Sequence, residues 1–133
     1  MKKIIMFFTF TFVFILSLVG CTTEGKGELT RIDVLVENQN DTHIQDKDTL
    51  VVIESAFEQI KWDDKVVNMA RKADVKAVFF YTFDENIPET TVEYEIWFNE
   101  NVGTATIVSN VENKSYGELD KENAKILKSK LLN

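Results

Sequence analysis

Residues 91–99 constrain the fold of this chain more than any other segment, because apolar and polar side chains alternate along them with the single exception of Trp97. Such a period of two predicts a β-strand with one face toward a core. A glycine-containing turn at 100–103 and a second strand over 104–109 follow directly, so the two strands are expected to pair as an antiparallel hairpin. The apolar face holds Val92, Tyr94, Ile96 and Phe98, and the polar face holds Glu93, Glu95, Trp97 and Asn99.

Three other segments have strand character. Residues 29–37 alternate between apolar and polar side chains, residues 74–83 are rich in β-branched and aromatic side chains, and a short strand is expected around 115–117. The stretch 62–73 gives no clear signal and is expected to be a turn followed by a connector. Because three or four of these strands follow one another with only short turns between them, an antiparallel sheet is expected.

Helical spacing of apolar residues predicts two helices. The first covers 48–61, with Asp46 or Asp48 as its N-cap, and the second covers 121–132, capped by Asp120. Strands that follow one another, with helices set apart from them in the sequence, indicate the α+β class. We therefore expect one α+β domain over residues 29–133, with an antiparallel sheet of four to five strands and both helices packed on one face.

Residues 1–20 differ from the rest of the chain in composition. Lys2 and Lys3 precede an uncharged, largely apolar run over residues 4–19, which is typical of a cleaved secretory signal peptide. This run of sixteen residues is shorter than the roughly 20 needed to span a bilayer. The alternatives are an uncleaved transmembrane helix, an ordinary secretory signal followed by an unrelated cysteine, and a buried core helix.

The end of this segment, Leu18-Val19-Gly20-Cys21, resembles the lipobox of bacterial lipoproteins. The resemblance implies cleavage between Gly20 and Cys21 and lipidation of the Cys21 thiol, on the outer face of the cytoplasmic membrane. Lipidation would also account for a single cysteine in an exported protein. Residues 21–28 are then the lipidated cysteine and a flexible, glycine-containing tether.

The C-terminal half has a likeness of its own. Together with the lipobox, residues 74–132 resemble the YhfM-like small lipoproteins of Bacillus relatives. That resemblance implies a cell-surface lipoprotein without a defined molecular role, and it carries over no catalytic residue. It is based on the strand 94–98 with its return hairpin, and on Tyr116, Leu119, Glu122 and Leu127 leading into the last helix.

The net charge of the chain limits the kinds of partner that it can be expected to bind. Because Lys2 and Lys3 belong to the leader, residues 21–133 carry 13 basic and 22 acidic residues, a formal charge of −9. Binding to a phosphate backbone needs clustered Lys and Arg, so nucleic acid is not an expected partner. The expected contact with the membrane is through the lipid at Cys21 alone, and a protein or another envelope component remains as the other partner.

Side chains for the common catalytic and metal sites are scarce. His43 is the only histidine and lies in a polar stretch, where a solvated loop position is expected; no serine lies in a nucleophile-elbow motif. No transition-metal site and no cofactor are predicted, since ligands at suitable spacing are absent. Carboxylates alone can bind calcium, but ordinary solvated acids are the expectation for both acidic loops. The acids concerned are Asp41, Asp46 and Asp48 in one loop and Asp84, Glu85 and Glu89 in another.

Three functions follow from these observations. The first is a non-enzymatic binding module whose contact strip is Trp97, Glu93 and Glu95, because an exposed tryptophan on a polar strand face can anchor a partner. The competing reading of Trp97 is that it packs under a helix. The second is a small envelope hydrolase that uses carboxylates, and the third is a purely structural surface protein. Exposed aromatics without converging acids favour the first, whereas a deep cleft holding two acids favours the second.

Overall fold

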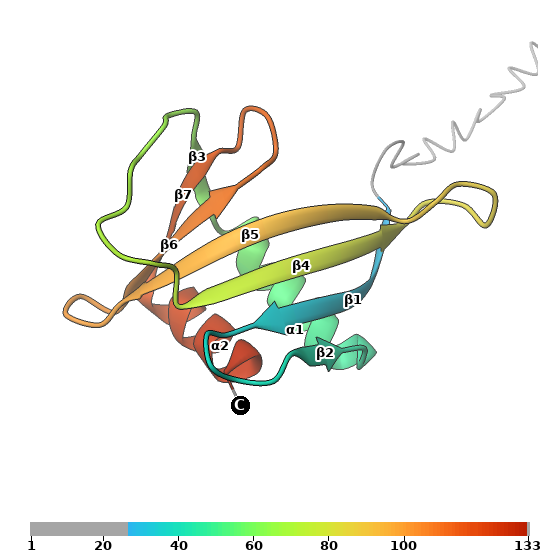
Figure 1. Ribbon diagram of the computed structural model, residues 1–133, viewed down its shortest axis with the longest axis horizontal. Coiled ribbons are helices and arrows are strands. Elements are labelled where there is room, and N and C mark those ends of the chain that lie inside the picture. Colours follow the sequence, from blue (N-terminus) through green and yellow to red (C-terminus); the bar gives the residue numbers. More distant parts are fainter. Residues whose placement is uncertain (1–26, 133) are drawn as a thin grey trace, which may run out of the picture.

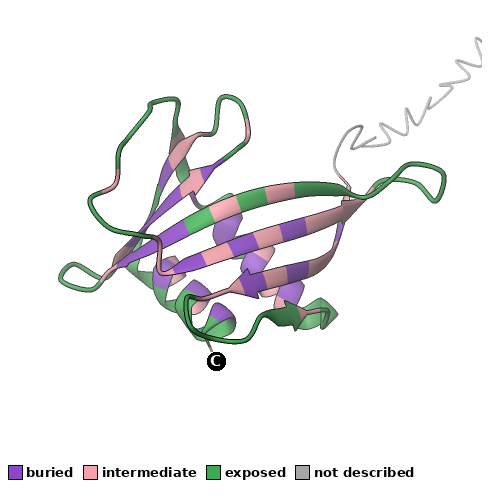
Figure 2. Ribbon diagram, viewed as in Figure 1, coloured by how far each residue is buried: buried purple, intermediate pink, exposed green. Residues whose placement is uncertain are grey.

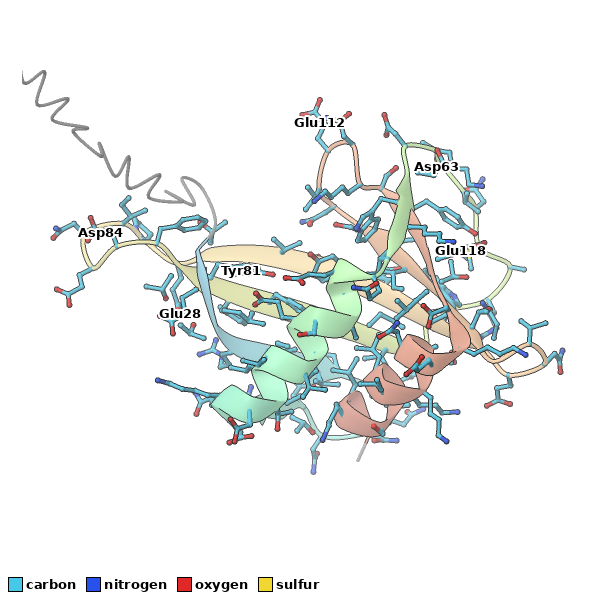
Figure 3. All side chains as sticks on the ribbon, turned by 180° about the vertical axis from the view of Figure 1, so that it is seen from behind. Glu28, Asp63, Tyr81, Asp84, Glu112 and Glu118 are labelled. Atoms are coloured by element: carbon cyan, nitrogen blue, oxygen red, sulfur yellow. The ribbon has the colours of Figure 1, made fainter. Side chains whose placement is uncertain are left out.

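A twisted sheet of seven antiparallel strands carries two helices on one of its faces (Figure 1; seen from the helix side in Figure 3). The computed structural model describes residues 27–132. Neighbours in the sheet follow the order β2-β1-β4-β5-β6-β7-β3. In chain order the elements are β1 (Glu28–Leu35), β2 (Thr42–Ile44), α1 (Lys47–Glu58), β3 (Lys61–Asp63), β4 (Val75–Thr82), β5 (Thr90–Asn99), β6 (Thr104–Ser109), β7 (Tyr116–Leu119) and α2 (Lys121–Leu131).

The strand order explains the position of α1. This helix lies between β1 and β3 in the sequence, yet β3 forms one edge of the sheet and β1 lies next to the opposite edge. The chain must therefore cross the sheet within α1, and it does so over one face. The other strands form a simple meander from β4 to β7, joined by short turns. As a result Phe57, near the end of α1, packs against both Phe79 of β4 and Tyr94 of β5.

The core lies between this sheet face and the two helices. Alternate residues of β4 and β5 point into it, and Figure 2 shows the resulting alternation of buried and less buried positions. The helix α1 contributes its apolar stripe, which removes apolar surface from water and is the main stabilising contribution expected for such a domain. The stripe consists of Leu50, Ile53, Ala56 and Phe57, and the strands supply Val75, Ala77, Phe79, Ile96, Phe98 and Ile107 among others.

The α+β class, the antiparallel sheet and the two helices are confirmed, but the expected number of strands is wrong. The sheet has seven strands rather than four to five. The two short strands at the edges, β2 and β3, were missed because three residues are too few for a period to appear. The first helix also ends at Glu58 rather than 61, since Lys61 already pairs with Glu118 of β7.

Both helix caps follow the expected chemistry. Asp46 accepts a hydrogen bond from the Thr49 backbone N–H at 3.0 Å, and Asp120 accepts one from Asn123 at 2.9 Å. The predicted cleavage at Gly20 and lipidation at Cys21 lie outside the described residues. Within residues 27–132 no helix is both long and apolar enough to cross a membrane.

Candidate functional site

Two glutamates and two tyrosines meet between α1 and the sheet, around a hollow of about 320 Å³. The glutamates come from the last two turns of α1, and the tyrosines come from the adjacent strands β4 and β5. Figure 3 shows Tyr81 beside α1 on the helix side of the sheet. Five elements or turns contribute to the lining, which consists of Glu54, Phe57, Glu58, Trp62, Tyr81, Tyr94 and Lys114.

Aromatic packing fixes the position of the Tyr94 ring. Its centroid lies 4.8 Å from that of Phe57 on α1 and 4.8 Å from that of Phe79 on β4. Trp62 of β3 adds a third ring at 6.3 Å. Tilted and edge-on pairs at these separations are favourable beyond the area they bury. The hydroxyl of Tyr94 is therefore held by a rigid support rather than by a mobile side chain.

Hydrogen bonding and charge determine what the two tyrosines can do. The hydroxyls of Tyr81 and Tyr94 form a hydrogen bond with each other. Burial, together with neighbouring Tyr94 and the Glu54 carboxylate, raises the pKa of Tyr81. Burial raises the pKa of Tyr94 as well, although its hydrogen bond with Tyr81 acts in the opposite direction. Both hydroxyls stay protonated at neutral pH, so they serve as hydrogen-bond donors and not as bases.

A second hollow of about 370 Å³ lies along the same helix. It shares Glu54 and Glu58 with the first hollow, so these two carboxylates stand between the two spaces. Apolar side chains form much of its wall, including Val51, whose exposed fraction is 63%. An extended molecule lying along α1 would therefore pass both carboxylates. The remaining lining residues are Glu28, Leu29, Lys47, Leu50 and Ser55.

The residues proposed as a contact strip lie on the opposite face of the sheet. Trp97 is not exposed, since only 4% of its surface is accessible. It does not pack under a helix either: its indole Nε1–H donates to the backbone carbonyl of Arg71, in the segment that joins β3 to β4. Glu93 and Glu95 are exposed. Glu95 and Trp97 line an open groove of about 940 Å³ there, which does not include Glu93.

His43 is not the solvated loop residue that was expected. It lies on β2, and its Nδ1 atom is 2.6 Å from Oδ1 of Asp33 on β1. The same carboxylate oxygen accepts a hydrogen bond from Arg31 at 2.9 Å. The side chain of His43 nevertheless remains 60% exposed. The structure thus gives this histidine a partner from the neighbouring strand.

The acidic loops do not converge. Of the three acids considered for calcium in the first loop, Asp46 serves as the cap of α1, where Thr49 also donates its hydroxyl to it at 2.7 Å. Across the described part of the chain, no group of three or more His, Cys, Asp or Glu side chains is placed to hold a metal ion.

Sequence reasoning did not single out Glu54, Glu58, Tyr81 or Tyr94 as site residues. It placed the glutamates on the solvent face of a helix and Tyr94 on the apolar face of a strand, and both assignments are correct. The sequence did contain one local signal. Glu54 and Glu58 are like charges four residues apart on a helix, and such a pair destabilises the helix. Only the crossing of α1 over β4 and β5 brings the acids to the tyrosines.

Comparison with known proteins gives one fold neighbour. No protein-family model matches the chain, and no curated protein matches it either. Among solved structures, the chain is similar to a thioesterase-like protein from Clostridium sporogenes, solved at 1.70 Å. The two are 24% identical, the match covers 79% of this chain and 95% of that chain, and the TM-score is 0.52. At this level the likeness establishes the fold.

This finding corrects two predictions made from the sequence. The chain was expected to be a non-enzymatic binding module, and no enzyme, but its fold neighbour is a thioesterase-like protein. The hollow beside α1 holds two acids, Glu54 and Glu58, but it is a small open hollow and not the deep cleft expected for the hydrolase alternative. The non-enzymatic reading is therefore abandoned because of the fold neighbour.

Proposed function

We propose that this domain is a hydrolase of acyl thioesters, with its active site in the hollow between α1 and the sheet. The observation that carries the proposal is the placement of Glu54, a helix carboxylate, beside the paired hydroxyls of Tyr81 and Tyr94. A carboxylate next to neutral hydrogen-bond donors suits attack of water on a carbonyl group. The fold shared with a thioesterase-like protein supports the same class of substrate.

In this mechanism Glu54 is the general base. The water oxygen forms a bond to the carbonyl carbon while the carboxylate takes one water proton. As the tetrahedral intermediate collapses, the carbon–sulfur bond breaks, and the proton passes from Glu54 to the leaving thiolate. The products are a carboxylic acid and a thiol, so atoms and charges balance.

The Tyr94 hydroxyl is the donor to the carbonyl oxygen. A hydrogen bond between two protonated hydroxyls uses only one of their two protons, so the other is available to an acceptor in the hollow. A donor held in place by packed rings stabilises the negative charge that develops on the oxygen without having to reorganise. Tyr81 acts through Tyr94 and is a positioning residue.

The two hollows assign the two ends of the substrate. Leu29, Leu50 and Val51 line the hollow on the far side of Glu54, which suits an apolar acyl chain. Trp62 and Lys114 line the other, which suits a polar leaving group. The thioester bond then lies beside Glu54, between the two spaces.

The test is an assay of the purified protein with a series of acyl thioesters of increasing chain length, in which the released thiol is measured. We expect Glu54→Gln to lower kcat by about 10²–10⁴-fold. The matched control is Glu93→Gln, which removes the same group from the opposite face of the sheet. If no chain length is hydrolysed by the wild type, or if both variants retain full activity, the proposal fails.

For the location of the protein, the lipobox-like sequence supports anchoring through a lipid at Cys21 on the outer face of the cytoplasmic membrane. Replacing Cys21 by Ala should leave an unlipidated form that is released or accumulates as the precursor. Cell fractionation with metabolic labelling by a fatty acid measures this. Wild-type processing and membrane retention in the variant would contradict lipid anchoring.

A further inference from the structure

A positively charged pocket lies at the end of this acidic domain, away from the proposed active site. It has a volume of about 430 Å³ and lies between α2 and the turn that joins β5 to β6. Lys121, Lys125 and Lys128 all line it, because residues four and three apart share one face of a helix. The helix α2 carries four lysines and one glutamate, a concentration of positive charge in a chain with formal net charge −7.

These lysines are neutralised only in part. The Asp74 carboxylate, which does not line the pocket, interacts electrostatically with Lys128. Glu100 is the one carboxylate among the lining residues. Its side chain is 82% exposed, and its oxygen is 3.8 Å from Nζ of Lys128, which is the longest of the described ion pairs. Lys121, in the first turn of α2, stands at the helix end whose dipole disfavours a cation. The position of Lys121 is therefore unfavourable for helix stability, although Lys128 in the last turn is favourably placed.

An apolar floor completes the pocket, formed by the side chains of Phe98 and Ala124. The Nζ atom of Lys128 lies 5.8 Å from the centroid of the Phe98 ring. Three ammonium groups suit a doubly charged anion, and the apolar floor leaves room for an organic group attached to it.

We propose that this pocket binds a phosphate ester. A soluble ester fits the position of the pocket better than a lipid headgroup does, because the proposed lipid anchor at Cys21 precedes β1, which begins at the other end of the sheet. Glu28, where β1 begins, pairs with Thr82 at one end of the sheet, whereas the turn beyond Asn99 lies at the other end of β5 (Figure 1). Ten strand residues separate these ends, which corresponds to about 30 Å.

The experiment is an NMR titration of the purified protein with glycerol 3-phosphate, with inorganic phosphate as a second probe. We expect shifts confined to α2 and residues 99–104, and a dissociation constant that rises with salt. Lys125→Gln should weaken binding roughly five- to tenfold. Lys130→Gln is the matched control, since it removes the same charge from the same helix but does not line the pocket, and it should change binding less than twofold.

Two results would overturn the proposal. The first is the absence of a saturable chemical-shift change with either probe. Equal weakening of ligand binding by both lysine variants counts in the same way, since the helix would then act only through diffuse charge. The other is failure to bind glycerol 3-phosphate together with Lys125-dependent binding to phosphatidylglycerol vesicles, but not to phosphatidylcholine vesicles. That result would assign the pocket to lipid headgroups. Neither result bears on thioester hydrolysis, because the active-site hollow shares no residue with this pocket.

Discussion

Trp97 donates its indole Nε1–H to the backbone carbonyl of Arg71 over 2.8 Å, and this bond holds the segment between β3 and β4 against the outer face of the sheet. The Arg71 guanidinium also contacts Asp74, with N–O distances of 2.6 and 3.0 Å. Asp74 in turn accepts a hydrogen bond from the Phe98 backbone N–H at 2.7 Å. A tryptophan that would be a contact residue if exposed is instead part of a structural clamp.

Asp74→Asn should loosen this clamp. The substitution keeps an acceptor for Phe98 but removes the ion pair with Arg71, so we expect a loss of about 1–2 kcal/mol in the free energy of unfolding. Trp97 fluorescence should shift to longer wavelength as the segment moves away. Urea unfolding monitored by fluorescence measures both. Glu85→Gln, in the exposed turn after β4, is the control and should stay within about 0.5 kcal/mol of wild type.

The same carboxylate predicts a pH dependence. The Arg71 guanidinium, followed by the Phe98 N–H, lowers the pKa of Asp74 below its ordinary value. Because the folded-state pKa is below the unfolded one, this contribution to stability is fully present above about pH 4 and is lost as pH falls through the folded value. The stability gap between wild type and Asp74→Asn should be constant from pH 7 to about 5 and close below pH 4. A constant gap down to pH 2 would contradict the lowered pKa.

Tyr94→Phe tests the donor assigned in the proposed mechanism. Removing its hydroxyl should lower kcat by about 10²-fold with little change in KM, since the bond forms mainly in the transition state. Tyr81→Phe leaves the Tyr94 hydroxyl in place and should cost less. Because both tyrosines have raised pKa values, neither variant should shift the pH profile below pH 9. Steady-state kinetics over pH 5–9 decides between these outcomes.

Gly117→Ala should destabilise the edge of the sheet. A methyl group there would overlap Cγ2 of Ile60 and lie 2.8 Å from Cε3 of Trp62, so both side chains would have to move. We expect a cost of about 1–3 kcal/mol, typical of overpacking. Since Trp62 lines the active-site hollow, KM should rise as well. The double variant with Ile60→Ala should lose less stability than the sum of the two single variants, because the alanine makes room for the new methyl group. A simply additive double variant would show that Ile60 is not the obstacle.

Much of the secondary structure was determined by local pattern. Residues 91–99 have the right period for a strand, and β5 covers Thr90–Asn99. The strand expected over 104–109 is β6, with the same bounds. Asp120 was identified as a helix cap because an acid before a helical apolar pattern can satisfy free N–H groups. These features depend on residues a few positions apart, and the sequence displays those relationships directly.

Tertiary structure alone decided the edges of the sheet and the burial of Trp97. Nothing in Lys61–Asp63 indicates a strand, and these residues become one by pairing with β7, more than fifty positions later. In the same way, Trp97 occupies the polar face that its alternation predicts, but a segment from before β4 covers it. Pairing and cover by distant segments leave no trace in local periodicity.

The candidate active site also depends partly on local sequence and partly on tertiary structure. The sequence by itself determined that Glu54 lies on the polar face of a helix and that Tyr94 lies on the apolar face of a strand. The strand order places β1 and β3 near opposite edges of the sheet, so α1 has to cross β4 and β5. Only this crossing places the carboxylate beside the two hydroxyls. Side-chain periodicity is a local property of the backbone, whereas the meeting of residues 54, 81 and 94 depends on which strands pair.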